Sequence, residues 1–333
     1  LMAAKTVMKS GWLTMGPKAK LLENYFWKKM GSNSNKFSLA VSSCTTALHL
    51  GLIALGVGED DEVICPSLTF VADANAIKYT GAKIVFCDIV SENNLSICSK
   101  DFEKKITKKT KAIIVVHYAG YPANLDKIIK IAKKYNIKII EDSCHALFSN
   151  YKKKQLGNFG DLSVFSFYSN KNITSGEGGM IYGKKKYMNK ISLLRNHGIK
   201  RNNFSSKKFN SQYDVIHCGF NYRLNEISSA ILIEQLKKIN RLNNKRKILA
   251  SYYKMKINKS FSNITIPFEK LIGGNFSYHI YPIILPKKIN RMKFVNFLKK
   301  NGIETTTHYT PINRLRFYKT NIKLRNLDKI YKR

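Results

Sequence analysis

Short apolar runs alternate with helical patterns along the first half of the chain, and this alternation limits the possible folds more than any other feature. The runs of strand length are residues 37–41, 62–65, 83–87, 112–117 and 137–140. Intervening segments, such as residues 125–135, repeat apolar side chains at helical spacing. Strands that alternate with helices form βαβ units, in which neighbouring strands run parallel. We therefore expect an α/β fold with helices packed against a mostly parallel sheet.

The second half of the chain has a different pattern, which predicts a second, smaller lobe. A long helix from residue 228 to beyond residue 246 would lead into that lobe. The other expected elements are strands at 161–168, 179–182 and 278–285, helices at 187–195 and 292–301, and a polar loop at 198–214. We therefore expect a large α/β/α domain at residues 1–240 and a smaller α+β domain at residues 241–333.

The formal net charge of +37 is unusual and limits the possible partners. Such an excess can indicate binding to nucleic acid, to a membrane surface or to an anionic substrate. The lysines are spread along the chain rather than gathered in one arm, and no nucleic-acid reader motif is present. No apolar run approaches the roughly 18 residues that span a bilayer. We therefore expect a protein that neither binds nucleic acid nor spans a membrane. The N-terminus also lacks a signal pattern, so we expect the protein to be cytoplasmic.

The six cysteines do not form a pattern of metal ligands. No pair has the Cys-x-x-Cys spacing, and no histidines cluster at zinc-ligand spacing. Several cysteines lie inside apolar stretches, where cysteine behaves as a small hydrophobic residue. We expect reduced thiols and no metal site.

The first candidate for chemistry is the segment at residues 43–46, which ends one expected strand and opens the next helix. Free amides at a helix N-terminus favour a phosphate group. The hydroxyl groups of Thr45 and Thr46 could add further donors. The same residues are also common as plain helix caps, so the pattern leaves both interpretations open.

The second candidate is Asp142, which directly follows the apolar strand at 137–140. Burying a carboxylate is costly unless it has a partner. Asp142 could belong to a salt bridge, bind a metal ion, or hold a protonated pyridine nitrogen. His145 lies about one helical turn further along the chain.

The third candidate is Lys171, which differs in its surroundings from the other lysines of the chain. It follows an aromatic strand and precedes a glycine-rich turn at residues 176–179, where the backbone could approach a ligand closely. A lysine that forms a Schiff base needs a desolvated site, which lowers its pKa and frees its amine as a nucleophile. The glycines do not match a GxGxxG or Walker loop.

Together these segments resemble the DegT/DnrJ/StrS-type sugar aminotransferases, which are enzymes of fold type I that depend on pyridoxal 5'-phosphate (PLP). The matching stretches follow the family's order along nearly the whole chain: SGWLT at 10–14, SCTTAL at 43–48, DEVICPSLTF at 61–70, HYAG at 117–120, EDSCHA at 141–146, FSFYSNKNITSGEGGM at 165–180, GFNYRLNE at 219–226 and HYTP at 308–311. Each motif is weak alone, but the set is specific.

The resemblance implies a role for each candidate residue. Lys171 would bind PLP covalently, and Asp142 would bind the pyridinium nitrogen. His145 would lie near the ring and its phenolic oxygen, and Phe70 would stack on the ring. The phosphate would be held by Thr45, Thr46 and Ser166, with Asn221 reaching it from a partner subunit, so that the active unit is a homodimer. The substrate would be approached by Trp12, Thr14, His308 and Tyr309.

The resemblance also implies the reaction. The amino group of L-glutamate would pass to a nucleotide-linked keto-sugar. The amino-acid sequences at residues 118–120 and 171–174 most resemble those of members that aminate C4 of UDP-sugars for surface polysaccharides. Amination at C3 of a dTDP- or GDP-keto-sugar is the alternative within the family. A dehydratase branch carries histidine at the lysine position, which Lys171 argues against.

Two other classes are weighed against this interpretation. A nucleic-acid-binding protein would explain the charge, and a catalytically inactive relative would keep the fold but normally lose Lys171 or Asp142. The sequence departs from the family at Cys44, where many members have glycine. It also ends at Arg333, before the further strand and helix usual in the family, so we expect an incomplete small domain.

Overall fold

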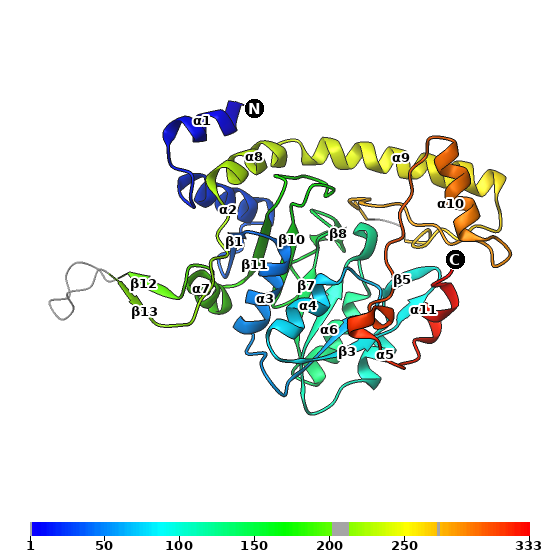
Figure 1. The fold of residues 1–333 in the computed structure, drawn as a ribbon, viewed down its shortest axis with the longest axis horizontal. Coiled ribbons are helices and arrows are strands. Elements are labelled where there is room, and N and C mark those ends of the chain that lie inside the picture. The colour runs from blue at the N-terminus through cyan, green and yellow to red at the C-terminus, as the bar shows by residue number, and fades with distance from the viewer. Residues whose placement is uncertain (1, 202–212, 272–273) are drawn as a thin grey trace.

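A seven-stranded sheet forms the centre of the computed structural model, which describes residues 2–201, 213–271 and 274–333 (Figure 1). Its strands, in spatial order, are β1 (Lys36–Val41), β11 (Gly179–Lys184), β10 (Leu162–Ser166), β7 (Lys138–Asp142), β6 (Thr110–Val116), β2 (Glu62–Pro66) and β3 (Lys83–Cys87). The pairs from β10 to β3 are parallel, and only β11 runs antiparallel to its two neighbours. The expected α/β fold with a mostly parallel sheet is confirmed.

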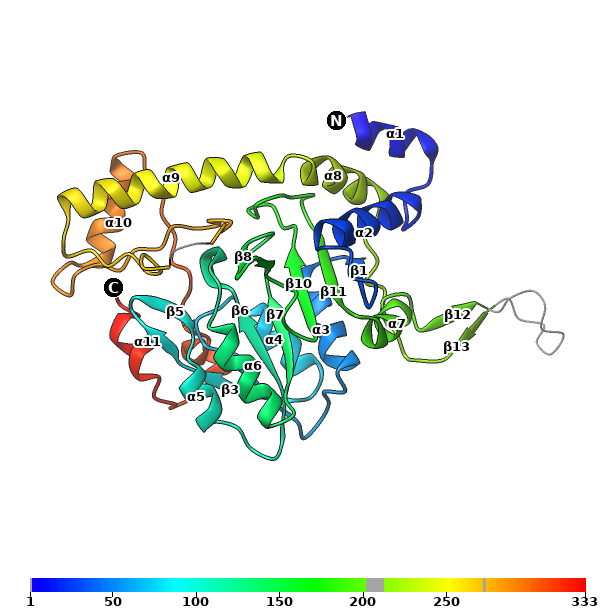
Figure 2. The same ribbon diagram turned by 180° about the vertical axis from the view of Figure 1, so that it is seen from behind.

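Both faces of the sheet are buried, which explains why strand β6 is a continuous apolar run. Its side chains alternate between two clusters: Ile114 packs on one face and Ile113 on the other. The first face is covered by α3 (Cys44–Ala54), α4 (Ala72–Tyr79) and α7 (Lys185–Leu194). The second is covered by α5 (Ser99–Lys104), α6 (Leu125–Lys134), α2 (Pro17–Lys29) and α8 (Glu226–Leu236), and Figure 2 shows α6 against it.

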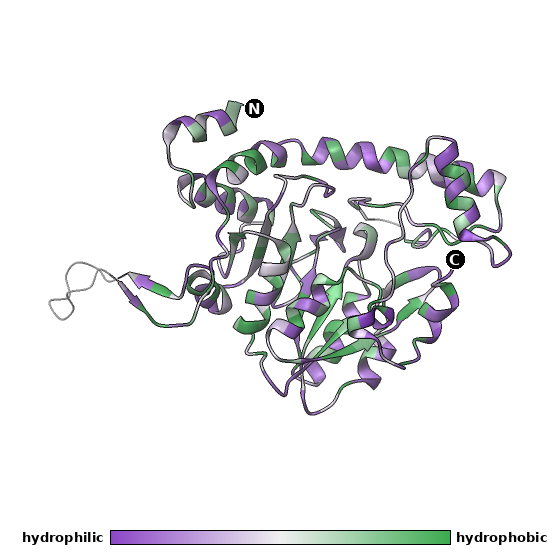
Figure 3. Cartoon of the chain, in the orientation of Figure 1, coloured by the Kyte–Doolittle hydropathy of each residue, from purple (hydrophilic) through white to green (hydrophobic). Residues whose placement is uncertain are grey.

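The expected long helix is present as two helices, α8 and α9 (Ile239–Ser260), and α9 leads away from the sheet to the smaller lobe (Figure 1). Figure 3 shows α9 alternating between polar and apolar turns, whereas the central strands are apolar. The expected helix at 292–301 is confirmed as α10 (Arg291–Lys300). No helix within the described residues combines the length and apolar character needed to cross a bilayer.

Two expectations for irregular regions need correction. The expected strand at 278–285 forms only a single bridge, in which Ile284 exchanges two backbone hydrogen bonds with Thr265. The start of this segment instead bonds to the large lobe, because His279 N donates to Ala119 O at 3.1 Å. The expected loop at 198–214 carries paired strands at its ends, β12 (Ile199–Arg201) and β13 (Tyr213–Val215); residues 202–212 lie outside the described residues.

The rest of the chain forms short elements around this frame. They include α1 (Met2–Ser10), the hairpin β4 (Ile89–Ser91) and β5 (Asn94–Ile97), the hairpin β8 (Asn150–Tyr151) and β9 (Lys154–Gln155), and α11 (Arg325–Ile330). Helix α11 packs back against the large lobe: Asn326 N and Leu327 N both donate to the carboxylate of Asp88. The domain limits at 240 and 241 remain a prediction.

Candidate active site

Three candidate segments meet at the carboxyl edge of the sheet, where open α/β sheets bind their ligands. Strand β7 ends at Asp142, and β10 ends at Ser166 and turns towards Lys171. Strand β1 ends next to the N-terminus of α3. The backbone ties the first two together, because Ser143 N donates to Val164 O at 2.9 Å.

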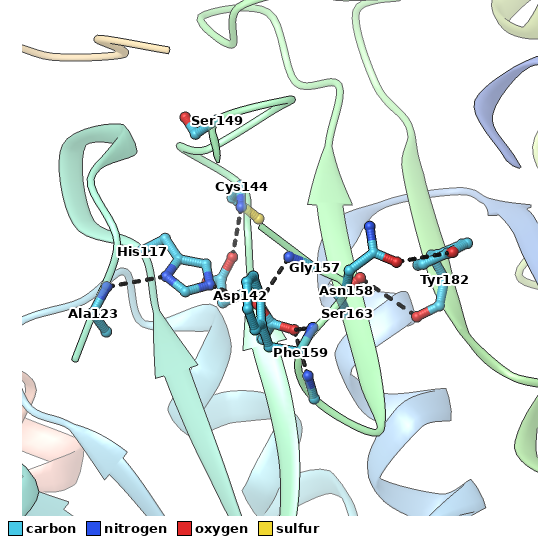
Figure 4. A network of polar contacts seen from close by, with 12 residues as sticks. His117, Ala123, Asp142, Cys144, Ser149, Gly157, Asn158, Phe159, Ser163 and Tyr182 are labelled. Carbon is cyan, nitrogen blue, oxygen red and sulfur yellow. Dashed lines mark hydrogen bonds and ion pairs between the residues drawn. The ribbon is translucent and has the colours of Figure 1, made fainter. Parts of the chain in front are cut away.

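The end of β7 carries two buried acids, Glu141 and Asp142, with different surroundings. Figure 4 labels Asp142 and several partners of the network. Glu141 accepts hydrogen bonds from His117 Nε2 at 2.9 Å and from the amides of Gly157, Phe159 and Gly160 at 2.6–2.8 Å. Burial would raise the pKa of Glu141, but the hydrogen bond from His117 and those of the amides outweigh it and lower that pKa. Glu141 is therefore a fully partnered structural acid.

Asp142 points the other way and has far fewer partners. Its Oδ1 accepts the backbone N–H of Cys144 at 2.9 Å, as Figure 4 shows, and the residue is 7% exposed. Successive side chains of a strand face opposite sides, so Glu141 faces the network below and Asp142 faces the site. An anionic oxygen in this position can bind a cationic N–H group of a ligand.

The N-terminus of α3 lies beside this acid and is closed by a capping box. Thr46 N donates to Ser43 Oγ at 3.2 Å, and Ser43 N donates to Thr46 Oγ1 at 3.1 Å. The Thr46 hydroxyl also donates to Ser43 O, so a phosphate would have to share it. The hydroxyl of Thr45 has no partner among the described residues. A side chain at Gly179 would meet the Ser43 backbone at 2.5 Å, so only glycine allows this approach of β11.

Lys171 is held at the turn after β10 by its neighbours. Its backbone N–H donates to Tyr168 O at 3.0 Å. The next residue, Asn172, is buried and donates from Nδ2 to Asn243 Oδ1 and to Ser277 O, both at 2.9 Å. These bonds fix the backbone on the carboxyl-terminal side of Lys171 and link it to the smaller lobe.

The charge of Lys171 acts on three histidines. Burial, followed by the charge of Lys171, lowers the pKa of His145, of His279 (to about 3) and of His308. His145 and His279 lie with ring centroids 4.4 Å apart. The sequence alone does not indicate His279 as a site residue, because its segment at 278–285 has only strand character.

The tautomer of His145 follows from its two contacts. Ala119 N donates to His145 Nδ1 at 3.3 Å, and His145 Nε2 lies 3.1 Å from the Tyr309 hydroxyl. Because its pKa is lowered well below the ordinary value, mainly by burial, the ring is neutral at neutral pH. Nδ1 is thus an acceptor, and Nε2–H donates to Tyr309.

Phe70 and His308 complete this side of the site. The Phe70 ring is exposed and lies 5.9 Å from the Tyr309 ring. The backbone oxygen of His308 accepts a hydrogen bond from the Tyr118 hydroxyl. The structure therefore brings Phe70, His145 and His308 together around the ring of Tyr309. Their expected roles remain predictions.

The remaining candidates are not joined to this group by contacts among the described residues. Trp12 is exposed, and its ring covers Gly16. Thr14 and Asn221 are exposed as well. Ser166 accepts the N–H of Tyr168 at 3.4 Å. Their proposed roles remain predictions.

Two cysteines meet beneath the site, which the sequence did not indicate because they are 100 residues apart. Cys44 Sγ and Cys144 Sγ lie 2.9 Å apart as free thiols. Together with Asp142, their ligand atoms lie within 4.8 Å of one another, a spacing that could hold a metal ion. The same carboxylate is the candidate anchor for PLP.

A lysine amine, a buried acid and a helix N-terminus form the combination that PLP-dependent enzymes use. The model of the DegT/DnrJ/EryC1/StrS aminotransferase family matches residues 1–333. Among relatives, the uncharacterized protein MJ1066 of Methanocaldococcus jannaschii is 41% identical over 325 residues, which are 94% of this chain and 81% of that protein.

Solved structures give the same result. The aminotransferase TlmJ from Streptoalloteichus hindustanus has a TM-score of 0.91 at 29% identity, covering 99% of this chain and 87% of that one. Helicobacter pylori PseC, an aminotransferase of pseudoaminic acid biosynthesis, has a TM-score of 0.88 at 33% identity, covering 99% and 88%. The sugar aminotransferase Spr1654 from Streptococcus pneumoniae, in its PLP form, has a TM-score of 0.86 at 28% identity, covering 96% and 84%.

The chain belongs to the DegT/DnrJ/EryC1/StrS aminotransferase family. It is a PLP-dependent sugar aminotransferase of fold type I, which confirms the expected fold class, cofactor and class of reaction. The residues present fit PLP: Asp142 would face the ring nitrogen, the start of α3 would take the phosphate, and Lys171 would supply the amine.

Proposed function

We propose that this enzyme moves the amino group of L-glutamate to C4 of a UDP-linked keto-sugar used to build surface polysaccharide or glycan. The observation that carries the proposal is the position of Lys171. Its ammonium group acts electrostatically on His145 and on the thiols of Cys44 and Cys144. Lys171 follows strand β10, which pairs with β7 up to Val164 and Asp142.

Lys171 would act as the general base and acid of the reaction. PLP, when bound, draws electrons away from the carbon that carries the amino group. The Lys171 amine would remove the proton from the α-carbon of glutamate and, in the second half of the reaction, deliver a proton to the sugar carbon. Asp142 would hold its negative charge opposite the protonated ring nitrogen.

Neutral donors and an aromatic ring would orient the bound groups. His145 holds Tyr309 through Nε2–H, and the charge of Lys171 acts on His145. The exposed ring of Phe70 offers a flat surface for stacking. The free hydroxyl of Thr45 and the start of α3 would bind the phosphate.

The preference for an anionic sugar nucleotide rests on charge and on likeness. The net charge of +37 favours the carboxylates of glutamate and the diphosphate of the sugar. PseC, an aminotransferase involved in pseudoaminic acid biosynthesis, is 33% identical to this chain. We place Trp12, Thr14, His308 and Tyr309 at the substrate.

We include a homodimer in the proposal. Asn221 is exposed, whereas its neighbour Tyr222 is fixed because Ser42 N donates to Tyr222 O at 2.9 Å. An exposed amide beside the start of α3 could reach the phosphate of a second subunit. Mixing Lys171→Ala and Asn221→Ala proteins should restore turnover through mixed dimers. If the mixture stays as inactive as the two separate proteins, the shared site is wrong.

The role of Lys171 is tested with a matched lysine. Lys171→Ala should lose the visible absorption of bound PLP and lose turnover by at least about a hundredfold, the typical weight of general base catalysis. Lys127→Ala changes an exposed lysine on α6 and should retain both. Full turnover in Lys171→Ala would refute the proposed role.

The acceptor is tested with a panel of sugar nucleotides. After glutamate converts the enzyme to its amino form, UDP-4-keto, dTDP-3-keto and GDP-4-keto sugars are added separately, and the return of the PLP absorption is followed. The fastest return should come with the UDP-4-keto sugar. A faster return with either of the other two would overturn the proposed nucleotide and ring position.

A further inference from the structure

A second acid lies beside Asp142, and the proposed mechanism does not use it. Asp73 stands in the first turn of α4 and is only 1% exposed. Thr69 Oγ1 donates to its Oδ2 at 2.6 Å. Its Oδ1 is buried and has no hydrogen-bond partner within the described residues. Such an atom is costly unless a donor or a proton satisfies it.

The acid that interacts with Asp73 is Asp142. The two acids interact both as neighbouring charges and as hydrogen-bonding groups. Burial, followed by the charge of Asp142, raises the pKa of Asp73 well above its ordinary value. Two carboxyls in one buried site do not both ionise, and they share a proton.

The contacts indicate which acid holds that proton. Asp142 Oδ1 accepts the N–H of Cys144 at 2.9 Å, which stabilises its anionic form. Asp73 is the more deeply buried of the two, at 1% exposed against 7%. The negative charge therefore belongs on Asp142 and the proton on Asp73 Oδ1. There the proton forms the hydrogen bond that Oδ1 otherwise lacks.

We propose that Asp73 is a positioning residue: its protonated carboxyl donates a hydrogen bond to Asp142 and keeps that carboxylate anionic and aimed at the cofactor's ring nitrogen. The inference rests on the proposed function of Asp142. The pair then carries one negative charge, which matches the single positive charge of a protonated ring nitrogen. In the competing explanation, Asp73 is an ionised acid that stabilises the N-terminus of α4 through the helix dipole.

The cofactor-free protein separates these two explanations by the sign of a pH effect. A raised pKa in the folded state gives stability that is present below the unfolded pKa of about 3.9 and is lost as pH rises through the folded pKa. Asp73→Asn, which needs no proton, should therefore melt at the same temperature as the parent near pH 4 and at a higher temperature near pH 7. A lower melting temperature at pH 7 would overturn the proposal.

A matched control is the acid at the same position of another helix. Asp126 is the second residue of α6, as Asp73 is of α4, but it is exposed. Hydrogen bonds from Lys152 and then Tyr151 lower its pKa. Asp126→Asn should therefore change stability with the opposite sign, melting lower than the parent at pH 7. If both variants changed the melting temperature at pH 7 in the same direction, the proposal would be overturned.

The positioning role is tested by PLP affinity, measured by fluorescence titration of the cofactor-free protein. Asp73→Asn keeps a donor to Asp142, whereas Asp73→Leu has a similar size and no donor. Asn should bind PLP as the parent does, and Leu about tenfold more weakly, the weight of one hydrogen bond to a charged group. Equal affinities would overturn the positioning role. If Asp73→Leu does not fold, the Asp73→Asn melting series still decides whether the proton is shared.

Neither measurement uses sugar turnover, so the two proposals fail separately. An unexpected acceptor in the sugar panel would overturn the proposed substrate and leave the shared proton intact. A wrong sign for Asp73→Asn would remove the shared proton and leave the aminotransferase reaction intact.

Discussion

Glu141 and Asp142 are consecutive acids of β7 that lie in two different regions of the molecule. Glu141, with no exposed surface, receives one imidazole and three backbone amides in the network below the site. Asp142 receives one backbone amide and shares the region above with Lys171. One acid has all its hydrogen-bonding capacity filled, and the other keeps capacity for a ligand.

The difference teaches how to separate structural from functional polar groups in this chain. A buried polar group that is fully partnered contributes to folding, and its loss leaves several donors unsatisfied. A buried group that keeps free capacity is costly in the empty protein and gains its partner when a ligand binds. The same division applies to the two threonines at the start of α3.

The largest effect on stability should come from the partnered acid. Glu141→Ala leaves His117 and three amides without an acceptor and should lower the free energy of unfolding by about 3–5 kcal/mol, as for other broken buried pairs. The pKa of Glu141 is lowered in the folded protein, so its contribution is present above the unfolded pKa of about 4.3 and is lost as pH falls. Urea unfolding at pH 7 and pH 4 measures both statements. If Glu141→Ala were as stable as the parent at pH 7, Glu141 would not be the structural acid of the pair.

The neighbouring acid should show the reverse. Asp142→Ala should weaken PLP binding by about 2–5 kcal/mol, the cost of removing one partner of a desolvated charge pair. Its cofactor-free form should unfold closer to the parent than Glu141→Ala does, because Asp142 accepts from the Cys144 amide and from the proposed Asp73 proton, whereas Glu141 accepts from four donors. Parallel PLP titration and urea unfolding of both variants give the comparison directly. Equal losses of stability would show that the two acids do not differ in role.

Much of this organisation could be predicted from the sequence, because it follows from local patterns. The apolar runs of β6 and β7, and the polar residues at the end of β7 and after β10, were enough to single out Asp142 and Lys171 as candidates. Pairings across long separations could not be predicted. Cys44 with Cys144, and Asp73 with Asp142, come together only through the order of the strands.

The smaller lobe shows a different reason for failure. The apolar residues at 278–285 have strand character, but a strand requires a neighbour to pair with, and Thr265 offers only one bridge. His279 in that segment lies against His145, a tertiary contact that no local pattern indicates. Local sequence patterns therefore predicted the strands of the central sheet better than the elements of the smaller lobe.

The smallest effect should separate Thr45 from Thr46. Thr46→Val breaks the capping box and should lower the free energy of unfolding by about 0.5–2 kcal/mol, with little change in PLP affinity. Thr45→Val removes a hydroxyl without a protein partner, so unfolding should stay within about 0.5 kcal/mol of the parent. Its PLP affinity should fall about fivefold, since one neutral hydrogen bond to the phosphate is worth about 1 kcal/mol. Both measurements use the same titration and urea series. If Thr46→Val were the variant that binds PLP more weakly, the partnered and the free hydroxyl would have exchanged roles, and partner number would not distinguish structure from function here.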